Sequence, residues 1–441
     1  MDADITFQTP QKIKQRRKNV KTLTKFHFTI HKPGVILKVE ARRIAFHIVY
    51  EEGVMKGNTG SSVAADPKAA GKEAAEKAKN ALSDVKVAFA YSSVAYDQGQ
   101  LLQGVAEALP GVPVLGNTSF TGIITPEGFI TGDSGFVGIM ALGGDDIVVG
   151  VAGKPKSGDA RATGREVAKE AVKNSGKSGA PAYFYMAASP GEEEFYLKGI
   201  TDVIGRVPFF GGSAADNSIA GEWKLFAGKQ VFADGVVVAF FYTDKPAANL
   251  FTGAYKETGN VGIITKVKDN RTLVEIDGVP ALKKYAQWAG VDPESLKGGN
   301  LLVYTITSPL GVKDRLGDLT AIRHPMNGND DYSMAIGANL AEKTAVIRME
   351  GSVDELISSA SQTLDKLKAK MNASPAAFHL VHCGGRRAGI GDRIDEVVQG
   401  VKKAAGDVPF IMEFTFGEYG LEDDGNNTTG GLMLSYTGFA K

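Results

Sequence analysis

The sequence contains almost no cysteine, with Cys383 as the single thiol among 441 residues. One cysteine excludes an internal disulfide and any zinc site built from several cysteines. Long apolar runs are also missing, because the longest, residues 135–144 and 236–242, stop well short of the roughly 20 residues that span a bilayer. These two absences predict a cytoplasmic protein that does not contact membranes.

Net charge is absent as well, since 50 basic residues balance 50 acidic ones. This balance argues against nucleic acid as a partner. The distribution is uneven, because residues 1–54 carry 11 Lys and Arg against five Asp and Glu.

This basic leader, residues 1–55, includes a predicted strand over 41–50 and has two interpretations. It is an arm for anionic partners, or it lies outside the native product. The second interpretation rests on the Glu-Glu-Gly sequence before Met55, whose codons can resemble a ribosome-binding site ahead of a start codon. We assign the leader no function.

After Met55, one pattern occurs three times: a strand, a polar or Gly-rich loop, an amphipathic helix, a Val-Pro pair and a second strand. The three copies begin near residues 85, 181 and 375. A strand–helix–strand unit favours parallel strands joined by a right-handed crossover. Further strand-like segments with Gly and Asp turns follow each unit and favour antiparallel pairing.

The predicted fold class is α/β (α+β mixed), with two related lobes of mixed sheets built from repeated strand–helix–strand units and added antiparallel strands. We expect a hairpin turn at Asp269-Asn270 and a helix over residues 281–290. A further helix is expected to start at Ser352, with a capping box to Glu355.

Two glycine-rich motifs fail as nucleotide sites, so we expect no cofactor. GKS at 176–178 lacks the first glycine of a phosphate loop, and GIGDRI at 389–394 lacks the third glycine of a dinucleotide fingerprint. A metal is not expected either, since the acidic turn near the C-terminus lacks the calcium-loop spacing. Its oxygen donors are Asp423, Asp424, Asn426 and Asn427.

Cys383 has the chemistry of a nucleophile, because Arg386 and Arg387 beside it can lower the pKa of its thiol. Its own segment supplies no base. His382 points to the opposite face of the strand, and His379 is roughly 13 Å away along it. A small, inert, buried side chain is the plainer interpretation.

Glu413 and Glu418 are the other residues with catalytic chemistry. They are an odd number of residues apart, so on one continuous strand they face opposite sides. They can form an acid–base pair only if the chain turns at Gly417. We therefore assign no catalytic residue.

The loops after the parallel strands are expected to meet at one edge of the sheets, where open α/β folds bind small ligands. Arg386 at that edge can bind a carboxylate and Glu418 an ammonium group, which together suit a small zwitterion. The alternative is that Arg386 and Glu418 pair with each other as a structural bridge. The candidate ligand residues at this edge are Gly116, Thr118, Gly211, Gly212, Asp216, Cys383, Arg386, Thr415, Gly417 and Glu418.

These motifs resemble a known family. The C-terminal third is similar to a FIST C-terminal domain in Cys383-x-x-Arg386, Glu396, Thr415-x-Gly417-Glu418 and the Asn/Thr pair of GNNTTG, which adds Asn427 to the candidate ligand residues. Residues 275–285 and 320–325 resemble other parts of that domain. VPVLGNTSFTG and VPFFGGSAAD resemble two marker segments of the FIST N-terminal domain. The chain departs from the family at Met412, Glu413 and Ile123.

The resemblance implies an intracellular sensory module that binds a small ligand such as an amino acid. It implies a FIST N-terminal domain over residues 56–247 and a FIST C-terminal domain over 248–441. We expect signal output to pass through a protein partner, because no output domain is recognised in the sequence. Two alternatives stay open: an enzyme acting on a small polar metabolite through Cys383 or Glu418, and a scaffold protein.

Overall fold

The computed structural model describes residues 27–32, 35–40, 54–313, 320–422 and 425–441. The chain divides into two units, residues 1–52 and 53–441. In the first unit, β1 (His27–Lys32) and β2 (Val35–Glu40) form an antiparallel pair. The predicted strand over 41–50 lies outside the described residues.

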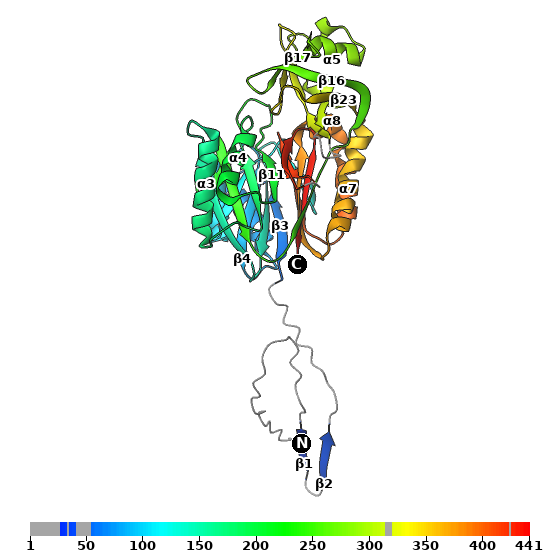
Figure 1. Cartoon of the computed structure of the whole chain (residues 1–441). Helices are drawn as coiled ribbons and strands as arrows, with labels where there is room; N and C mark the ends of the chain where they lie inside the picture. Colours follow the sequence, from blue (N-terminus) through cyan, green and yellow to red (C-terminus); the bar gives the residue numbers. More distant parts are fainter. Residues whose placement is uncertain (1–26, 33–34, 41–53, 314–319, 423–424) are drawn as a thin grey trace. The chain divides into compact units, whose positions relative to one another are not determined.

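Three six-stranded sheets of the second unit share one plan (Figure 1). In each, the central pair of strands is parallel, an antiparallel strand and an edge strand lie on one side, and a two-stranded hairpin lies on the other. The first sheet has the order β13 (Gln230–Phe232), β12 (Leu225–Ala227), β5 (Val114–Thr118), β4 (Val85–Ser92), β8 (Val137–Gly143), β3 (Lys56–Ser62). The second has β27 (Asn427–Gly430), β26 (Glu418–Leu421), β11 (Phe209–Ser213), β10 (Tyr183–Ala188), β14 (Gly235–Tyr242), β9 (Val148–Pro155). The third has β7 (Gly128–Ile130), β6 (Ile123–Thr125), β25 (Phe410–Thr415), β24 (Pro375–Cys383), β28 (Leu434–Ala440), β15 (Ala247–Thr252).

The hairpins are exchanged in a cycle among the three repeated units. Hairpin β6–β7 follows β5 of the first sheet in the chain but pairs with β25 of the third. Hairpin β12–β13 follows β11 of the second sheet and pairs with β5 of the first. Hairpin β26–β27 follows β25 of the third and pairs with β11 of the second. Each sheet is therefore completed by another unit.

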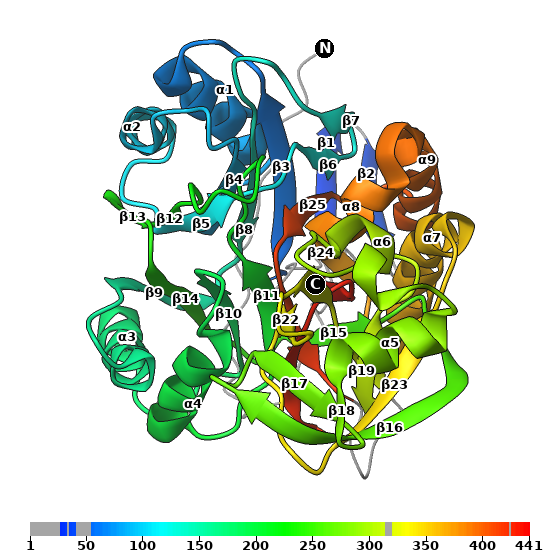
Figure 2. The same cartoon turned by 90° about the horizontal axis from the view of Figure 1, so that it is seen from above.

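Helix pairs cover the outer faces of the sheets (Figure 2). The pairs are α1 (Pro67–Lys79) with α2 (Gln98–Ala108), α3 (Ala160–Ser175) with α4 (Glu193–Ile204), and α7 (Val353–Lys370) with α9 (Ile394–Ala405). Glycines allow the first two pairs to approach closely. A Cβ on Gly104 would lie 1.9 Å from the Lys68 carbonyl oxygen, and one on Gly199 would lie 2.0 Å from that of Arg161.

The inner faces of the three sheets meet in one core. Phe89, Tyr185 and His379 occupy corresponding positions in the first parallel strand of each unit, and all three are buried. Their ring centroids are 5.0 to 5.8 Å apart. The three units thus meet at these rings, and further ring pairs such as Phe241 with Phe439 add contacts between units.

A fourth sheet is inserted between β15 and α7. The predicted hairpin turn at Asp269-Asn270 is confirmed, because both residues have positive φ and lie between β16 and β17. The elements of this insertion are β16 (Lys256–Lys268), β17 (Thr272–Ile276), β18 (Val279–Pro280), α5 (Ala281–Ala289), η1 (Pro293–Ser295), α6 (Leu302–Thr305), β19 (Leu310–Lys313), β20 (Thr320–Arg323), β21 (Pro325–Gly328), β22 (Met334–Ile336) and β23 (Ala345–Glu350).

The α/β class, the repeated strand–helix–strand units and the added antiparallel strands are confirmed. The capping box of Ser352 and Glu355 at the start of α7 is confirmed as well. Helix α8 (Gly384–Ile390) and η2 (Gly391–Arg393) connect β24 to α9. None of the helices in the described residues has the length and apolar composition needed to cross a bilayer.

A chain that begins at Met55 should fold like the full-length protein. Met55 is fully buried in the core of the 53–441 unit, and we predict that residues 1–54 are dispensable for folding. We expect its melting temperature to lie within about 2 °C of the full-length value, measured by differential scanning calorimetry. A decrease of more than about 5 °C would show that residues 1–54 stabilise the fold.

Candidate functional site

Cys383 lies at the end of β24 and caps the first turn of α8. Its side chain is 5% exposed, and its sulfur accepts hydrogen bonds from the backbone N–H groups of Gly385 (3.3 Å) and Leu432 (3.2 Å). Burial raises the pKa of the thiol well above its usual value, and the nearby Glu418 carboxyl raises it further. Cys383 is therefore a neutral, buried thiol.

Arg386, in α8, is fully buried. Its Nη2 donates to the Leu356 carbonyl oxygen (2.9 Å) and the Ser359 hydroxyl oxygen (2.6 Å), both in α7. Its Nε and Nη1 have no hydrogen-bond partner in the described part of the chain. A buried N–H group without an acceptor carries a large desolvation cost, and a charged one costs more.

Glu418 is fully buried at the start of β26. Its carboxyl accepts hydrogen bonds from the Thr415 hydroxyl and the Met433 backbone N–H, both at 2.9 Å. Burial raises the pKa of Glu418 to about 8, although both hydrogen bonds and Arg386 act to lower it. Among the described residues Glu418 forms no ion pair with Arg386, so a direct salt bridge between them is not part of this structure.

The segment from Gly430 to Met433 covers this site. The N–H groups of Leu432 and Met433 bind the Cys383 sulfur and the Glu418 carboxyl, respectively. Leu432 has a φ of 54°, a left-handed conformation that is strained for a residue with a branched side chain. Two glycines, Gly430 and Gly431, precede it. The covering segment therefore contains two glycines, which adopt many backbone conformations, followed by a leucine in a strained one.

The predicted residues of the first two units have contacts within the fold. A Cβ on Gly116 or Gly211 would lie within 1.9 Å of a carbonyl oxygen of the neighbouring strand. Thr118 accepts a hydrogen bond from the Lys224 N–H (2.9 Å). Asp216 accepts backbone N–H groups of its own loop, including those of Ser218 (2.9 Å) and Glu222 (2.8 Å). These contacts give the four residues structural roles.

Gly212 contacts the C-terminal motif. It pairs with Glu418 across β11 and β26, and an added Cβ would lie 2.6 Å from the Thr415 methyl group and 2.8 Å from the Gly417 carbonyl oxygen. The same contact restricts Gly417, whose Cβ would lie 2.7 Å from the Ser213 hydroxyl oxygen. The structure thus brings Gly212, Thr415, Gly417 and Glu418 together, with Cys383 beside them.

Glu413 lies elsewhere, in a buried polar cluster between the three units. Its Oε1 lies 3.3 Å from His379 Nε2, and its Oε2 accepts the Asn117 side-chain amide at 2.8 Å. The Tyr185 hydroxyl donates to Asn117 Oδ1 (2.9 Å), and the Tyr91 hydroxyl forms a hydrogen bond with His379 Nε2. Glu413 and Glu418 share no partner, so the two glutamates do not form an acid–base pair.

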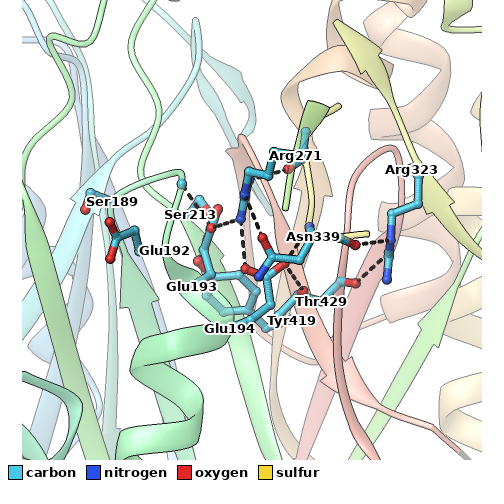
Figure 3. Close-up of polar contacts among 12 residues, drawn as sticks. Ser189, Glu192, Glu193, Glu194, Ser213, Arg271, Arg323, Asn339, Tyr419 and Thr429 are labelled. Atoms are coloured by element: carbon cyan, nitrogen blue, oxygen red, sulfur yellow. Dashed lines mark hydrogen bonds and ion pairs between the residues drawn. The ribbon is translucent and has the colours of Figure 1, made fainter. Parts of the chain in front are cut away.

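A cluster that the sequence analysis missed joins α4 to the inserted sheet (Figure 3). Arg271, after the β16–β17 turn, forms ion pairs with Glu193 (2.6 Å) and Glu194 (2.8 Å) at the start of α4. Glu193 also accepts the Ser213 hydroxyl (3.0 Å), which in turn contacts the Tyr419 hydroxyl (2.6 Å). Burial raises the pKa of Glu193 in spite of Arg271. The sequence signal for this cluster was the run of three glutamates at 192–194. Acidic residues are common in the first turn of any helix, so the run does not by itself indicate a site.

Asn427 lines a cavity of about 530 Å³ next to this cluster. Its side-chain amide donates to the Val207 carbonyl oxygen (2.8 Å), whereas its Oδ1 has no partner among the described residues. Asn427 is thus separated from the Glu418 site and faces a different space. Asp423 and Asp424 lie outside the described residues. Among the residues that the structure does describe, no three His, Cys, Asp or Glu side chains are grouped so that they could hold a metal ion.

Comparison with known proteins identifies two domains. The family model of the FIST N domain matches residues 86–279, and that of the FIST C domain matches residues 281–421. No curated protein matches the chain. Among solved structures, a cyanuric acid hydrolase from A. caulinodans is similar at 7% identity and a TM-score of 0.33, over 88% of this chain and 100% of that one. PurLQS from Thermotoga maritima is similar at 11% identity and a TM-score of 0.23, over 88% and 74% of the two chains. TM-scores this low do not establish a shared fold.

The raised pKa of Glu418 should make stability depend on pH. Between about pH 4.5 and 8 the unfolded chain releases a proton that native Glu418 keeps. The free energy of unfolding therefore falls across this window by about 1.4 kcal/mol per pH unit and levels off above it. Glu418→Gln has no carboxyl group to titrate and does not show this loss. The difference in melting temperature, variant minus wild type, should therefore be larger at about pH 8.5 than at pH 5.

Thermal melts at both pH values check this expectation, with the exposed Glu166→Gln as the control that should follow wild type. An equal difference between Glu418→Gln and wild type at the two pH values would mean that native Glu418 is already ionised at pH 5.

Cys383 should react slowly with iodoacetamide at neutral pH in the native protein. The thiol is buried and its pKa is raised, so little thiolate is available to attack. Mass spectrometry should detect rapid alkylation only after denaturant is added. Rapid modification of the native protein would instead indicate an activated nucleophile.

Proposed function

Because this chain belongs to the FIST family, whose domains are sensory and signal-transduction modules, we propose that it binds a small zwitterion such as an amino acid between Arg386 and Glu418. The chain's two matched regions together supply both domains of the family. Cytoplasmic location and a protein partner for signal output belong to the same proposal.

The observation that carries this proposal is the state of the Arg386 guanidinium. Two of its three nitrogens have no acceptor among the described residues, although the side chain is fully buried. A buried cation of this kind is stabilised when an anion supplies acceptors, and a ligand carboxylate has two oxygens available. A ligand carboxylate can therefore accept hydrogen bonds from Nε and Nη1 of Arg386.

Glu418 supplies the second half of a zwitterion site. A ligand ammonium group beside its carboxyl would favour the ionised form and so lower the pKa that burial has raised. Entry requires movement of the covering segment 430–433, because Glu418 is fully buried and bonded to Met433. The strained Leu432 and the two glycines before it make this segment the part that can move.

Binding without chemistry is favoured over the enzyme alternative. A nucleophile needs a base within hydrogen-bond reach. The ring of His382 directs its Nδ1 toward the Cys383 carbonyl oxygen (3.0 Å), and His379 is part of the Glu413 cluster. The Glu418 carboxyl does form a hydrogen bond with the Cys383 side chain, but burial and that carboxyl hold the pKa of the thiol far above its usual value, so it stays protonated.

Glu418→Gln should weaken amino-acid binding by well over tenfold, since removing one partner of a desolvated charge pair costs about 2–5 kcal/mol. Thermal-shift screening of the standard amino acids identifies the ligand, because binding to the native state raises the melting temperature. Calorimetric titration then compares the variants. Glu413→Gln is the matched control, because it makes the same change at a buried glutamate outside the site.

Two results would contradict the proposal. If no amino acid raises the melting temperature or gives a saturable heat, the zwitterion assignment is wrong. If the ligand binds Glu418→Gln as tightly as wild type, Glu418 has a structural role only.

A further inference from the structure

The cavity beside Asn427 lies where three distant parts of the chain meet. Its walls come mainly from α4, from β20 and from β27 with the residue before it. Its volume of about 530 Å³ is within the range of small-molecule sites. It is separate from the Glu418 site, which is fully buried, and it is open to solvent. Its lining residues include Arg323, Lys198, Arg206, Glu194, Asp202 and Asn427.

Arg323 is held at the wall of this cavity by neutral groups, and among the described residues it forms no ion pair. Its Nε donates to the Asn339 carbonyl oxygen (3.2 Å), and its Nη1 donates to those of Ile322 (3.2 Å) and Thr429 (3.1 Å) (Figure 3). All three acceptors are neutral backbone groups. Its Nη2 has no hydrogen-bond partner among the described residues, and burial lowers the pKa of the guanidinium. The side chain is thus fixed in position by neutral backbone groups.

The carboxylates near Arg323 are engaged by other cations. Glu194 forms an ion pair with Arg271 at 2.8 Å and accepts the Asn339 N–H at 3.0 Å. Asp202 is bound by Arg161 (2.7 Å) and Arg165 (3.1 Å). The charges of Glu194 and Glu422 both act to raise the pKa of Arg323.

Two further cations line the cavity without an acidic partner. Arg206, just beyond α4, is exposed and forms no ion pair in the part of the chain that the structure describes. Lys198 is also exposed, and its ammonium lies 5.2 Å from the centroid of the Phe195 ring rather than beside a carboxylate. Together with Arg323, these side chains give the cavity an excess of positive charge.

We propose that this cavity binds a small molecule carrying two or more acidic groups, carboxylate or phosphate. Arg323 contacts one acidic group through Nη2, where no rearrangement of its side chain is needed. Lys198 and Arg206 at the cavity wall contact the others. Because α4 lies in the FIST N match and Arg323 in the FIST C match, the bound polyanion connects the two domains.

The test uses citrate and inorganic pyrophosphate as probes, which separate carboxylate from phosphate recognition. Isothermal titration of the full-length protein at low salt should give saturable binding of at least one probe. The double substitution Lys198→Gln and Arg206→Gln should weaken that binding by about tenfold or more, since each lost contact is a charged one. Both positions are exposed, so the fold should be retained.

Lys173→Gln with Lys177→Gln is the matched control, because it removes the same charge from exposed residues that do not line the cavity. It should bind the probe within about twofold of wild type. Arg323→Lys keeps the positive charge but loses the planar guanidinium with its several N–H donors, so it should also weaken binding. The proposal is overturned if neither probe binds at about 10 mM, if the Lys198/Arg206 variant binds like wild type, or if the control loses as much affinity. None of these results depends on Arg386 or Glu418, so the zwitterion site is tested separately.

Discussion

The backbone pairing of β26 with β11 is the constraint on which the candidate ligand site depends. Glu418 belongs to the third repeated unit by sequence, yet it lies opposite Gly212 of the second. The two strands can approach because residue 212 is a glycine. A Cβ at this position would collide with Thr415 and Gly417. This pairing fixes the direction of the Glu418 carboxyl, and hydrogen bonds from Thr415 and Met433 complete its environment.

Buried and half-buried charged side chains in this protein occur in three kinds of environment. Glu193 and Glu194 share Arg271 across the contact between α4 and the inserted sheet, so each carboxylate has a cation at 2.8 Å or less. Glu413 instead contacts a histidine of its own unit and a side-chain amide of the first unit. Arg386 and Arg323 differ from both, because neutral groups hold them and no carboxylate of the described residues forms an ion pair with them. Removing charges from water is costly unless they are paired, so unpaired arginines in fixed positions indicate where an anion would be stabilised.

Local patterns made much of the fold predictable from the sequence. The repeated strand–helix–strand units, the turn at Asp269-Asn270 and the capping box at Ser352 each depend on residues that are close in the chain. The exchange of hairpins could not be predicted, because β6 could pair with its own unit or another by the same alternation of side chains.

The site was predictable only in part, for the same reason. The positions of their loops predict Arg386 and Glu418 at one edge, and the two side chains do lie close enough to influence each other electrostatically. Their complete burial was not expected, since charged residues are mostly exposed. Arg271 and Glu193 are 78 positions apart in the sequence, so no local sequence pattern predicts their ion pair.

The cyclic exchange of hairpins also has a consequence for synthesis on the ribosome. The edge of β11 is complete only when residues 418–421 have left the ribosome and paired with it. At the usual rates of translation, about 10–40 s pass between the appearance of these two strands. For that time β11 presents unpaired backbone groups at the edge of its sheet, where strands from other chains can add. A nascent chain of this architecture must therefore keep an incomplete sheet from aggregating until the last repeat has been made.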